Sequence, residues 1–81
     1  IKILYDDKNL KQSIQIANEL RERNYTVLSY PIDKASSNVQ ASIYQITLTP
    51  NENMFTYRKE HTTFNSLNEL LKLLNGAKGA M

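Results

Sequence analysis

The acidic pair Asp6-Asp7 is the polar feature of this sequence that most suggests chemistry. It follows directly after the apolar run 1–5, which is typical of a buried strand. Ligands of an open α/β sheet usually meet the carboxyl ends of its strands, so Asp6 and Asp7 are a candidate polar site at the end of the sheet. The plainer interpretation is that one aspartate caps a helix and the other is exposed, because aspartate is a preferred N-cap residue. We favour the plainer interpretation.

A second candidate combines aromatic and basic side chains near the end of a predicted strand. Phe55 and Tyr57 alternate with other residues there, and Arg58 and Lys59 follow. Interleaved aromatic and basic residues on a strand form the platforms on which single-stranded RNA stacks. The same pattern is typical of an edge strand whose charged side chains discourage pairing with other chains, and this interpretation is preferred. Tyr57, Arg58 and Lys59 are therefore a candidate surface for a partner or for RNA.

The other reactive side chains form no recognisable catalytic or metal-binding pattern. His61 is the only histidine, and it has no sequence neighbour at a spacing suited to a metal site or an acid–base pair. The serines lack a histidine and aspartate setting, and Gly76 and Gly79 cannot form a glycine-rich phosphate loop. We therefore predict no catalytic residue, no cofactor and no metal. An enzyme that uses Asp6 and Asp7 is the last of the alternatives.

Length and composition describe one small folded domain. The chain has 81 residues, of which 41% are hydrophobic and 22% are charged, close to the values of ordinary globular proteins. Lys and Arg outnumber Asp and Glu by ten to eight. The excess is divided evenly, six against five in residues 1–40 and four against three in residues 41–81. This balance disfavours a free-standing nucleic-acid-binding domain, which usually concentrates positive charge on one face.

Cysteine content and apolar runs indicate the compartment. The sequence has no cysteine, which removes disulfides, thiolate zinc sites and cysteine nucleophiles together. Its uninterrupted apolar runs are far shorter than the ~20 residues that cross a bilayer. We expect a soluble, cytoplasmic protein without a membrane partner. The start at Ile1 rather than at methionine suggests a piece of a longer protein.

The first thirty residues predict a strand, a helix and a second strand. Residues 1–5 and 25–30 have strand propensity, and residues 9–23 between them predict a helix whose N-cap is Asp7 or Asn9. The apolar positions of this helix follow the 3.6-residue period and form one stripe, with Ile16 beside it: Leu10, Ile14, Ala17 and Leu20. A strand–helix–strand unit of this length indicates a right-handed crossover that joins parallel strands.

The second half predicts a hairpin and a closing helix. Residues 34–42 form either a short helix or a loop, and residues 43–49 alternate like a half-buried strand. A turn at residues 49–53 leads into a strand over residues 54–59. If both main helices lie on one side of the sheet, apolar surface on the other side needs a partner.

The closing helix begins at a capping box. Ser66 precedes the helix and Glu69 stands three residues later, ahead of a stripe of leucines that ends before Asn75-Gly76, a typical helix stop. The whole pattern is β-α-β-(α)-β-β-α, an α/β fold with a mixed sheet, a parallel β-α-β start and a C-terminal hairpin plus helix. The predicted domain covers residues 1–76, and residues 77–81 are a predicted flexible tail.

Two family resemblances follow from these elements. Residues 1–7 resemble the acidic start of response-regulator receiver domains, but the third strand ends in Thr49-Pro50 rather than in a phosphoacceptor aspartate. The chain is also too short for the five βα units of that family, so the receiver-domain hypothesis is disfavoured. Residues 9–11 and 16–27 resemble the anticodon-binding domain of class II aminoacyl-tRNA synthetases, with the histidyl branch nearest. There the first helix ends in a Leu-Arg pair, as Leu20-Arg21 does here, and the second strand follows after a small turn residue.

The resemblance implies a mixed sheet with flanking helices at the C-terminus of a longer protein. The sequence departs from the family where a glycine is usual at Asn24, where residues 34–42 replace a fuller helix, and where residues 49–52 replace a glycine–glutamate signature. These departures favour a synthetase-like family that has lost tRNA recognition, such as the regulatory subunits of ATP phosphoribosyltransferase in histidine biosynthesis.

The function implied by this resemblance is that of a non-catalytic C-terminal regulatory or interaction domain. Its expected partner is the rest of a larger parent chain or another protein, and DNA is not expected. One alternative is the tRNA anticodon-binding domain of a histidyl-tRNA synthetase, for which RNA is the partner. The other alternative is an unrelated α/β protein-interaction module.

Overall fold

The structure is a computed structural model that describes residues 1–34 and 44–79 of the chain. The elements follow one another along the chain in this order: β1 (Lys2–Tyr5), α1 (Leu10–Glu22), β2 (Leu28–Pro31), β3 (Tyr44–Leu48), β4 (Asn53–Tyr57), β5 (Glu60–Thr63) and α2 (Leu67–Gly79). Short 3₁₀ turns at Asp7–Asn9 and Ile32–Lys34 follow β1 and β2. The predicted α/β fold is confirmed.

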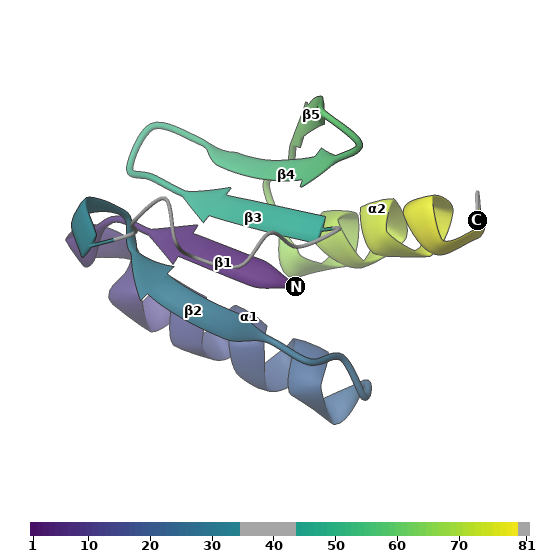
Figure 1. Ribbon diagram of the computed structural model, residues 1–81, viewed down its shortest axis with the longest axis horizontal. Helices are drawn as coiled ribbons and strands as arrows, with labels where there is room; N and C mark the ends of the chain where they lie inside the picture. Colours follow the sequence, from purple (N-terminus) through teal and green to yellow (C-terminus); the bar gives the residue numbers. More distant parts are fainter. Residues whose placement is uncertain (35–43, 80–81) are drawn as a thin grey trace.

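The described strands form one mixed sheet in the order β2-β1-β3-β4-β5 (Figure 1). β1 runs parallel to both of its neighbours, with Ile3 opposite Ser29 of β2 and opposite Ile46 of β3. β4 runs antiparallel to β3 and to β5. The predicted crossover from residues 1–5 through a helix to a parallel second strand is therefore confirmed. That second strand begins at Leu28, later than the predicted residue 25.

The strand predicted over residues 54–59 is wrong at its end. β4 stops at Tyr57, and Arg58 and Lys59 form a tight turn with φ angles of 52° and 69°. The chain then returns as β5, which the sequence did not predict and which makes β5, rather than β4, the edge strand. Left-handed turn positions are usually occupied by Asn, Asp or Gly, so an Arg-Lys turn carries no such signal.

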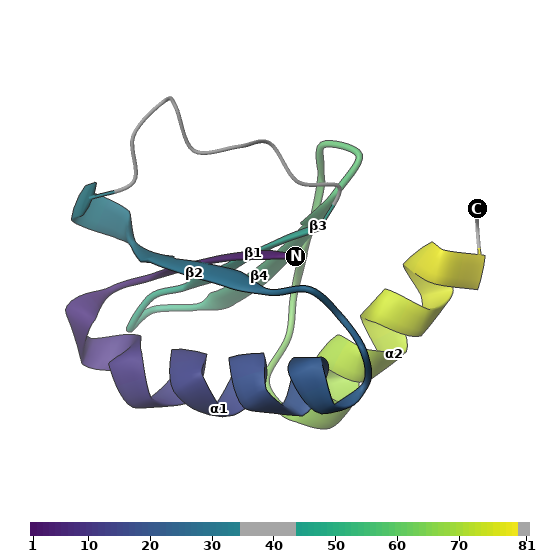
Figure 2. The same ribbon diagram turned by 60° about the horizontal axis from the view of Figure 1, so that its bottom comes forward.

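Both helices lie on the same face of the sheet (Figure 2). The core lies between them and that face, and it includes Ile3 and Ile46 from the sheet, Leu20 from α1 and Leu70 from α2, all with no exposed surface. Phe64, in the link between β5 and α2, is also buried. The neighbouring strand residues that alternate with Ile3 and Ile46 point to the opposite face, because successive side chains of a strand change sides.

The buried face of α1 differs from the predicted stripe. Ser13, Ile16, Ala17 and Leu20 are buried, whereas Leu10 and Ile14 are 46% and 51% exposed. The buried set has the spacing i, i+3, i+4 and i+7, which is the ordinary core face of a helix. The five apolar positions of this segment cover too wide an arc for all of them to face the sheet, so packing turns two of them outward.

The start of α1 follows one of the two predicted alternatives, because Asn9 is its N-cap residue. Asp6 caps the 3₁₀ turn before the helix: its Oδ1 accepts a hydrogen bond of 3.0 Å from the backbone N–H of Lys8. Asn9 makes no capping bond with its side chain. At the other end Asn24 adopts the predicted left-handed conformation, with φ of 68°.

α2 begins at the predicted capping box and ends later than predicted. Ser66 Oγ accepts a bond of 3.2 Å from the N–H of Glu69, and Glu69 Oε2 accepts one of 2.6 Å from the N–H of Asn65. The helix continues through Asn75-Gly76 to Gly79, so the predicted stop is wrong and residues 77–79 of the predicted tail are helical. Ala77 is buried, and its packing outweighs the local stop signal.

The short helix predicted for residues 34–42 lies almost wholly outside the described residues, since the 3₁₀ turn ends at Lys34. Neither helix of the described chain has the length and apolar content needed to span a bilayer.

Candidate interaction surface

The predicted aromatic and basic site, Tyr57 with Arg58 and Lys59, is not an open aromatic platform. The Tyr57 ring stacks against Tyr44 at 5.3 Å between centroids, and the Arg58 guanidinium lies 5.2 Å from the centre of the Tyr57 ring. The Tyr57 hydroxyl is buried and has no hydrogen-bond partner among the described residues. Tyr57 and Arg58 are thus brought together, Lys59 is exposed in the turn, and the aromatic ring is engaged by its neighbours.

This stack changes the acidity of Tyr44. Burial raises the pKa of the Tyr44 hydroxyl above its ordinary value, and the nearby Tyr57 and Tyr25 hydroxyls raise it further. The Arg58 guanidinium opposes these effects and lowers the pKa of Tyr44. The net shift is upward because a phenolate would lose its hydration in this position.

A pH dependence follows from that shift. An unfolded tyrosine ionises near pH ~10, whereas folded Tyr44 keeps its proton to a higher pH. The stability linked to Tyr44 is therefore complete below the unfolded pKa of ~10. It is lost as the pH rises from there through the higher pKa of the folded state, because the unfolded state then binds fewer protons than the folded state. We expect the wild-type chain to lose stability relative to Tyr44→Phe above pH ~10, measured by urea unfolding at a series of pH values. Parallel stability curves for the two proteins would contradict the expectation.

The predicted acidic site, Asp6 with Asp7, lies at the carboxyl ends of β1 and β2. The two aspartates line a shallow hollow of about 160 Å³ together with Tyr5, Ile32 and Asp33. Asp6 is engaged as the cap of the 3₁₀ turn, and Asp7 is exposed, which is the plainer of the two interpretations. No group of three or more metal-ligating side chains in residues 1–34 and 44–79 is arranged to hold a metal ion.

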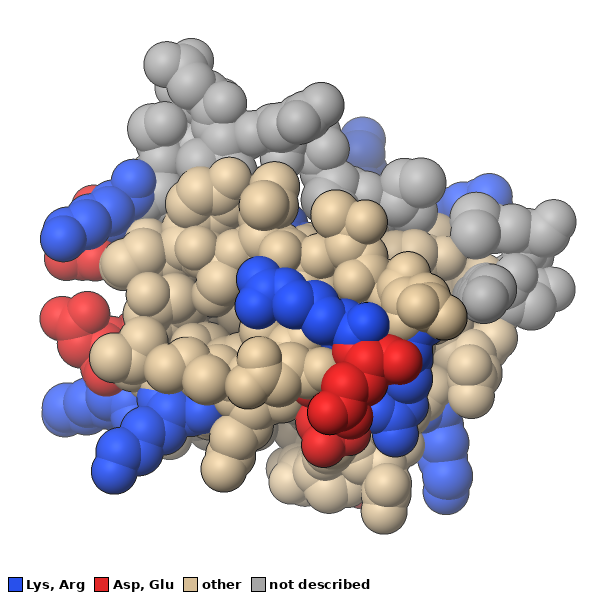
Figure 3. Space-filling view, turned by 90° about the horizontal axis from the view of Figure 1, so that it is seen from below, with Lys and Arg blue, Asp and Glu red and all other residues tan. Residues whose placement is uncertain are grey.

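A third surface was not predicted, and it lies along β2 and α1. Four large hydrophobic side chains of the described residues are strongly exposed: Leu10, Ile14, Leu28 and Ile32. All four belong to α1 or to β2 and the turn that follows it, and we term them the β2-edge patch. Figure 3 views the molecule from the side of β2 and α1, where uncharged side chains cover much of the surface, a Lys or Arg side chain with neighbouring Asp or Glu side chains lies near the middle, and further charged side chains lie at both ends.

The backbone of β2 limits how a partner can bind there. The Leu28 N–H donates to the Ile1 carbonyl, so Leu28 bonds inward to the first strand and its neighbours Val27 and Ser29 face the open edge. The Arg21 guanidinium already donates a bond of 2.9 Å to the Val27 carbonyl, and Pro31 has no N–H to offer. Arg21 and Pro31 therefore limit the backbone hydrogen bonds that this edge of the sheet can offer to another strand.

The two edges of the sheet differ in character. All four residues of β5 are exposed and polar, and its first residue is Glu60. The four residues of β2, Leu28 to Pro31, carry no charge. Charged side chains on an edge strand discourage association with other chains, so β5 is protected in this way and β2 is not.

The sequence contained a partial signal for the β2-edge patch. The apolar positions of α1 span more than one core face, and that excess indicates that some of them remain exposed. Which ones are exposed depends on how the helix rotates against the sheet, and the sequence alone does not give that rotation. Comparison with protein-family models, with curated proteins and with solved structures finds no match for this chain.

Proposed function

We propose that this chain is a non-catalytic interaction domain from the C-terminal end of a histidyl-tRNA synthetase-like regulatory protein in the cytoplasm, of the kind found in ATP phosphoribosyltransferase regulatory subunits. Its task is to dock onto the rest of its parent chain through the β2-edge patch. The observation that carries the proposal is the exposure of Leu10, Ile14, Leu28 and Ile32 on the neighbouring elements α1 and β2 and the turn after β2.

Exposed apolar side chains favour association because burial in an interface removes them from water. Single exposed apolar side chains are common on soluble proteins, but a group of them around an uncharged edge marks an interaction site. Burial of such surface stabilises a contact by roughly 25 cal/mol for each Å² removed from water. The parallel start of the mixed sheet supports the resemblance from which the parent family is inferred.

The described residues offer little that would support catalysis. His61 is exposed on the edge strand, where its Nδ1 and the Thr56 hydroxyl are hydrogen-bonded at 2.8 Å, far from the acidic pair in the sequence. Asp6 is engaged as a cap. These placements support an interaction domain over an enzyme.

The alternative function, tRNA anticodon binding, is favoured by one observation, the exposed basic turn of Arg58 and Lys59. Affinity for RNA comes mainly from neutralised phosphates and therefore falls steeply with salt. We expect a fluorescently labelled histidine tRNA transcript to show no binding to the chain at low salt in an anisotropy titration.

The control for this titration is the double variant Arg58→Gln, Lys59→Gln. Binding that weakens steeply with salt, with a slope that drops by about 2 in this variant, would support the anticodon reading and contradict the proposal. Absence of binding in both proteins would exclude anticodon binding as the function of this chain.

A further inference from the structure

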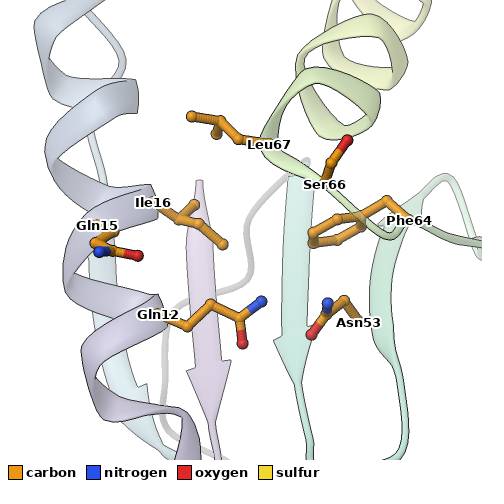
Figure 4. Close-up of a pocket in the computed structure, with 7 residues that line it drawn as sticks. All are labelled: Gln12, Gln15, Ile16, Asn53, Phe64, Ser66 and Leu67. Atoms are coloured by element: carbon orange, nitrogen blue, oxygen red, sulfur yellow. The ribbon is translucent and has the colours of Figure 1, made fainter.

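A small pocket opens between the two helices (Figure 4). The 3.6-residue turn of α1 places its lining residues Gln12 and Ile16 on the opposite flank from Leu10 and Ile14. Its volume is about 180 Å³. Ile16, Phe64 and Leu67 give it an apolar floor. Because none of the β2-edge patch residues lines it, an inference about this pocket stands apart from the docking proposed above.

The polar part of the pocket lining consists of three carboxamide side chains and the hydroxyl of Ser66. Gln12 and Gln15 reach it from α1, and Asn53 reaches it from the start of β4. Figure 4 shows the Gln12 and Asn53 side chains extending toward each other from opposite walls. Two neutral amides thus face one space from two different elements.

One of these amides is held in place by a neighbour. Asn9 Nδ2 donates a hydrogen bond of 2.8 Å to Gln12 Oε1, which fixes the Gln12 side chain and leaves its Nε2 as a donor for the pocket. The side chains of Gln15 and Asn53 have no hydrogen-bond partner within the described residues. The rim therefore offers free donors and acceptors of the same chemical type as a peptide group.

The lining also carries no charged side chain. A charged ligand would lose its hydration there without gaining an ion pair, which is costly. The volume is smaller than the ~300 Å³ or more of sites for drug-sized ligands, so the pocket holds one side chain rather than a whole cofactor. Apolar floor, amide rim and neutral lining are complementary to one residue of an extended peptide.

We propose that this pocket binds a single apolar residue in an extended, uncharged peptide segment of a protein partner. The side chain of that residue rests against Ile16, Phe64 and Leu67. Gln12 Nε2 donates to a peptide carbonyl on one side of it, and the Asn53 amide pairs with the peptide group on the other side. The interaction needs no rearrangement of the sheet, because all contacts are made by side chains.

The smallest probe of this proposal is N-acetyl-leucine N-methylamide, which has one apolar side chain between two peptide groups. We expect its titration into the ¹⁵N-labelled chain to shift the side-chain NH₂ signals of Gln12, Gln15 and Asn53 along saturating curves. The NH₂ signal of Gln45, whose Nε2 donates to Thr47 Oγ1 on the other face of the sheet, should not move. The corresponding aspartate probe, which is charged, should bind more weakly.

Matched variants complete the test. Gln12→Leu and Asn53→Leu should each weaken binding of the leucine probe by about threefold or more, because each removes a hydrogen bond and keeps the bulk of the side chain. Gln45→Leu should leave the affinity unchanged. Shifts that do not saturate in the wild-type chain, or that are equal at Gln45, overturn the proposal even if a variant fails to fold.

Discussion

Replacing Leu20 by alanine should lower the free energy of unfolding by about 2–5 kcal/mol, whereas replacing Ile14 by alanine should change it by less than ~0.5 kcal/mol. Both residues lie on α1, but Leu20 has no exposed surface and Ile14 is half exposed. The Leu20 variant leaves a cavity in the core between α1 and the sheet. Urea unfolding followed by circular dichroism measures both changes on the same chain.

The pair of variants tests which face of α1 is buried. A small domain has a total stability of roughly 5–10 kcal/mol, so the expected loss at Leu20 would leave a visible unfolded fraction at moderate urea concentrations. Equal losses in the two variants would mean that Ile14 belongs to the core. In that case α1 would not contribute its exposed apolar residues to the β2-edge patch, and the patch would be half as large.

The second large effect is expected in docking. The double variant Ile14→Glu, Leu28→Glu places two carboxylates on the β2-edge patch without touching the buried core. Its unfolding free energy should stay within ~1 kcal/mol of the wild type, because both side chains are half exposed. Its affinity for the preceding part of the proposed parent protein, produced separately, should fall about 30-fold or more, the cost of losing an interface hot spot.

The control for the docking variant carries the same added charge elsewhere. Asn51→Glu with Asn68→Glu changes two exposed residues, one in the turn between β3 and β4 and one in α2. This variant should dock like the wild type, as measured by isothermal titration calorimetry. If the patch variant also keeps its affinity, the β2-edge patch is not the docking surface.

Local sequence patterns predicted much of the fold. Periodicity and capping signals placed α1 and the start of α2, and the alternation of Tyr44, Ile46 and Leu48 placed β3 and its buried face. The parallel pairing of β1 with β2 followed from the crossover rule, which is a property of chain geometry and not of particular side chains. A helix, a strand and a β-α-β crossover are each determined by residues close together in the sequence.

The errors arose where distant contacts decide the structure. β5 was missed because the turn at Arg58-Lys59 lacks the usual Asn or Gly, and pairing with β4 forces both residues into left-handed conformations. α2 passes through Asn75-Gly76 because Ala77 gains burial beyond it. In both cases tertiary contacts outweigh a local preference.

The candidate sites show the same division. Asp6 capping a turn is a local interaction, and the sequence anticipated that an aspartate here serves as a cap. The β2-edge patch joins residues from α1 with residues from β2, and the pocket of Gln12 and Asn53 joins α1 with β4. Such surfaces form only when the elements pack together, so residue spacing in the sequence does not predict them.

The central claim is that the β2-edge patch is covered in the intact protein. Hydroxyl-radical footprinting with mass spectrometry tests it most directly, by comparing the complete parent protein with the 81-residue chain. We expect Leu10, Ile14, Leu28 and Ile32 to be labelled in the chain alone and protected in the complete protein, with exposed His61 labelled in both. Equal labelling of the four patch residues in the two proteins would contradict the account.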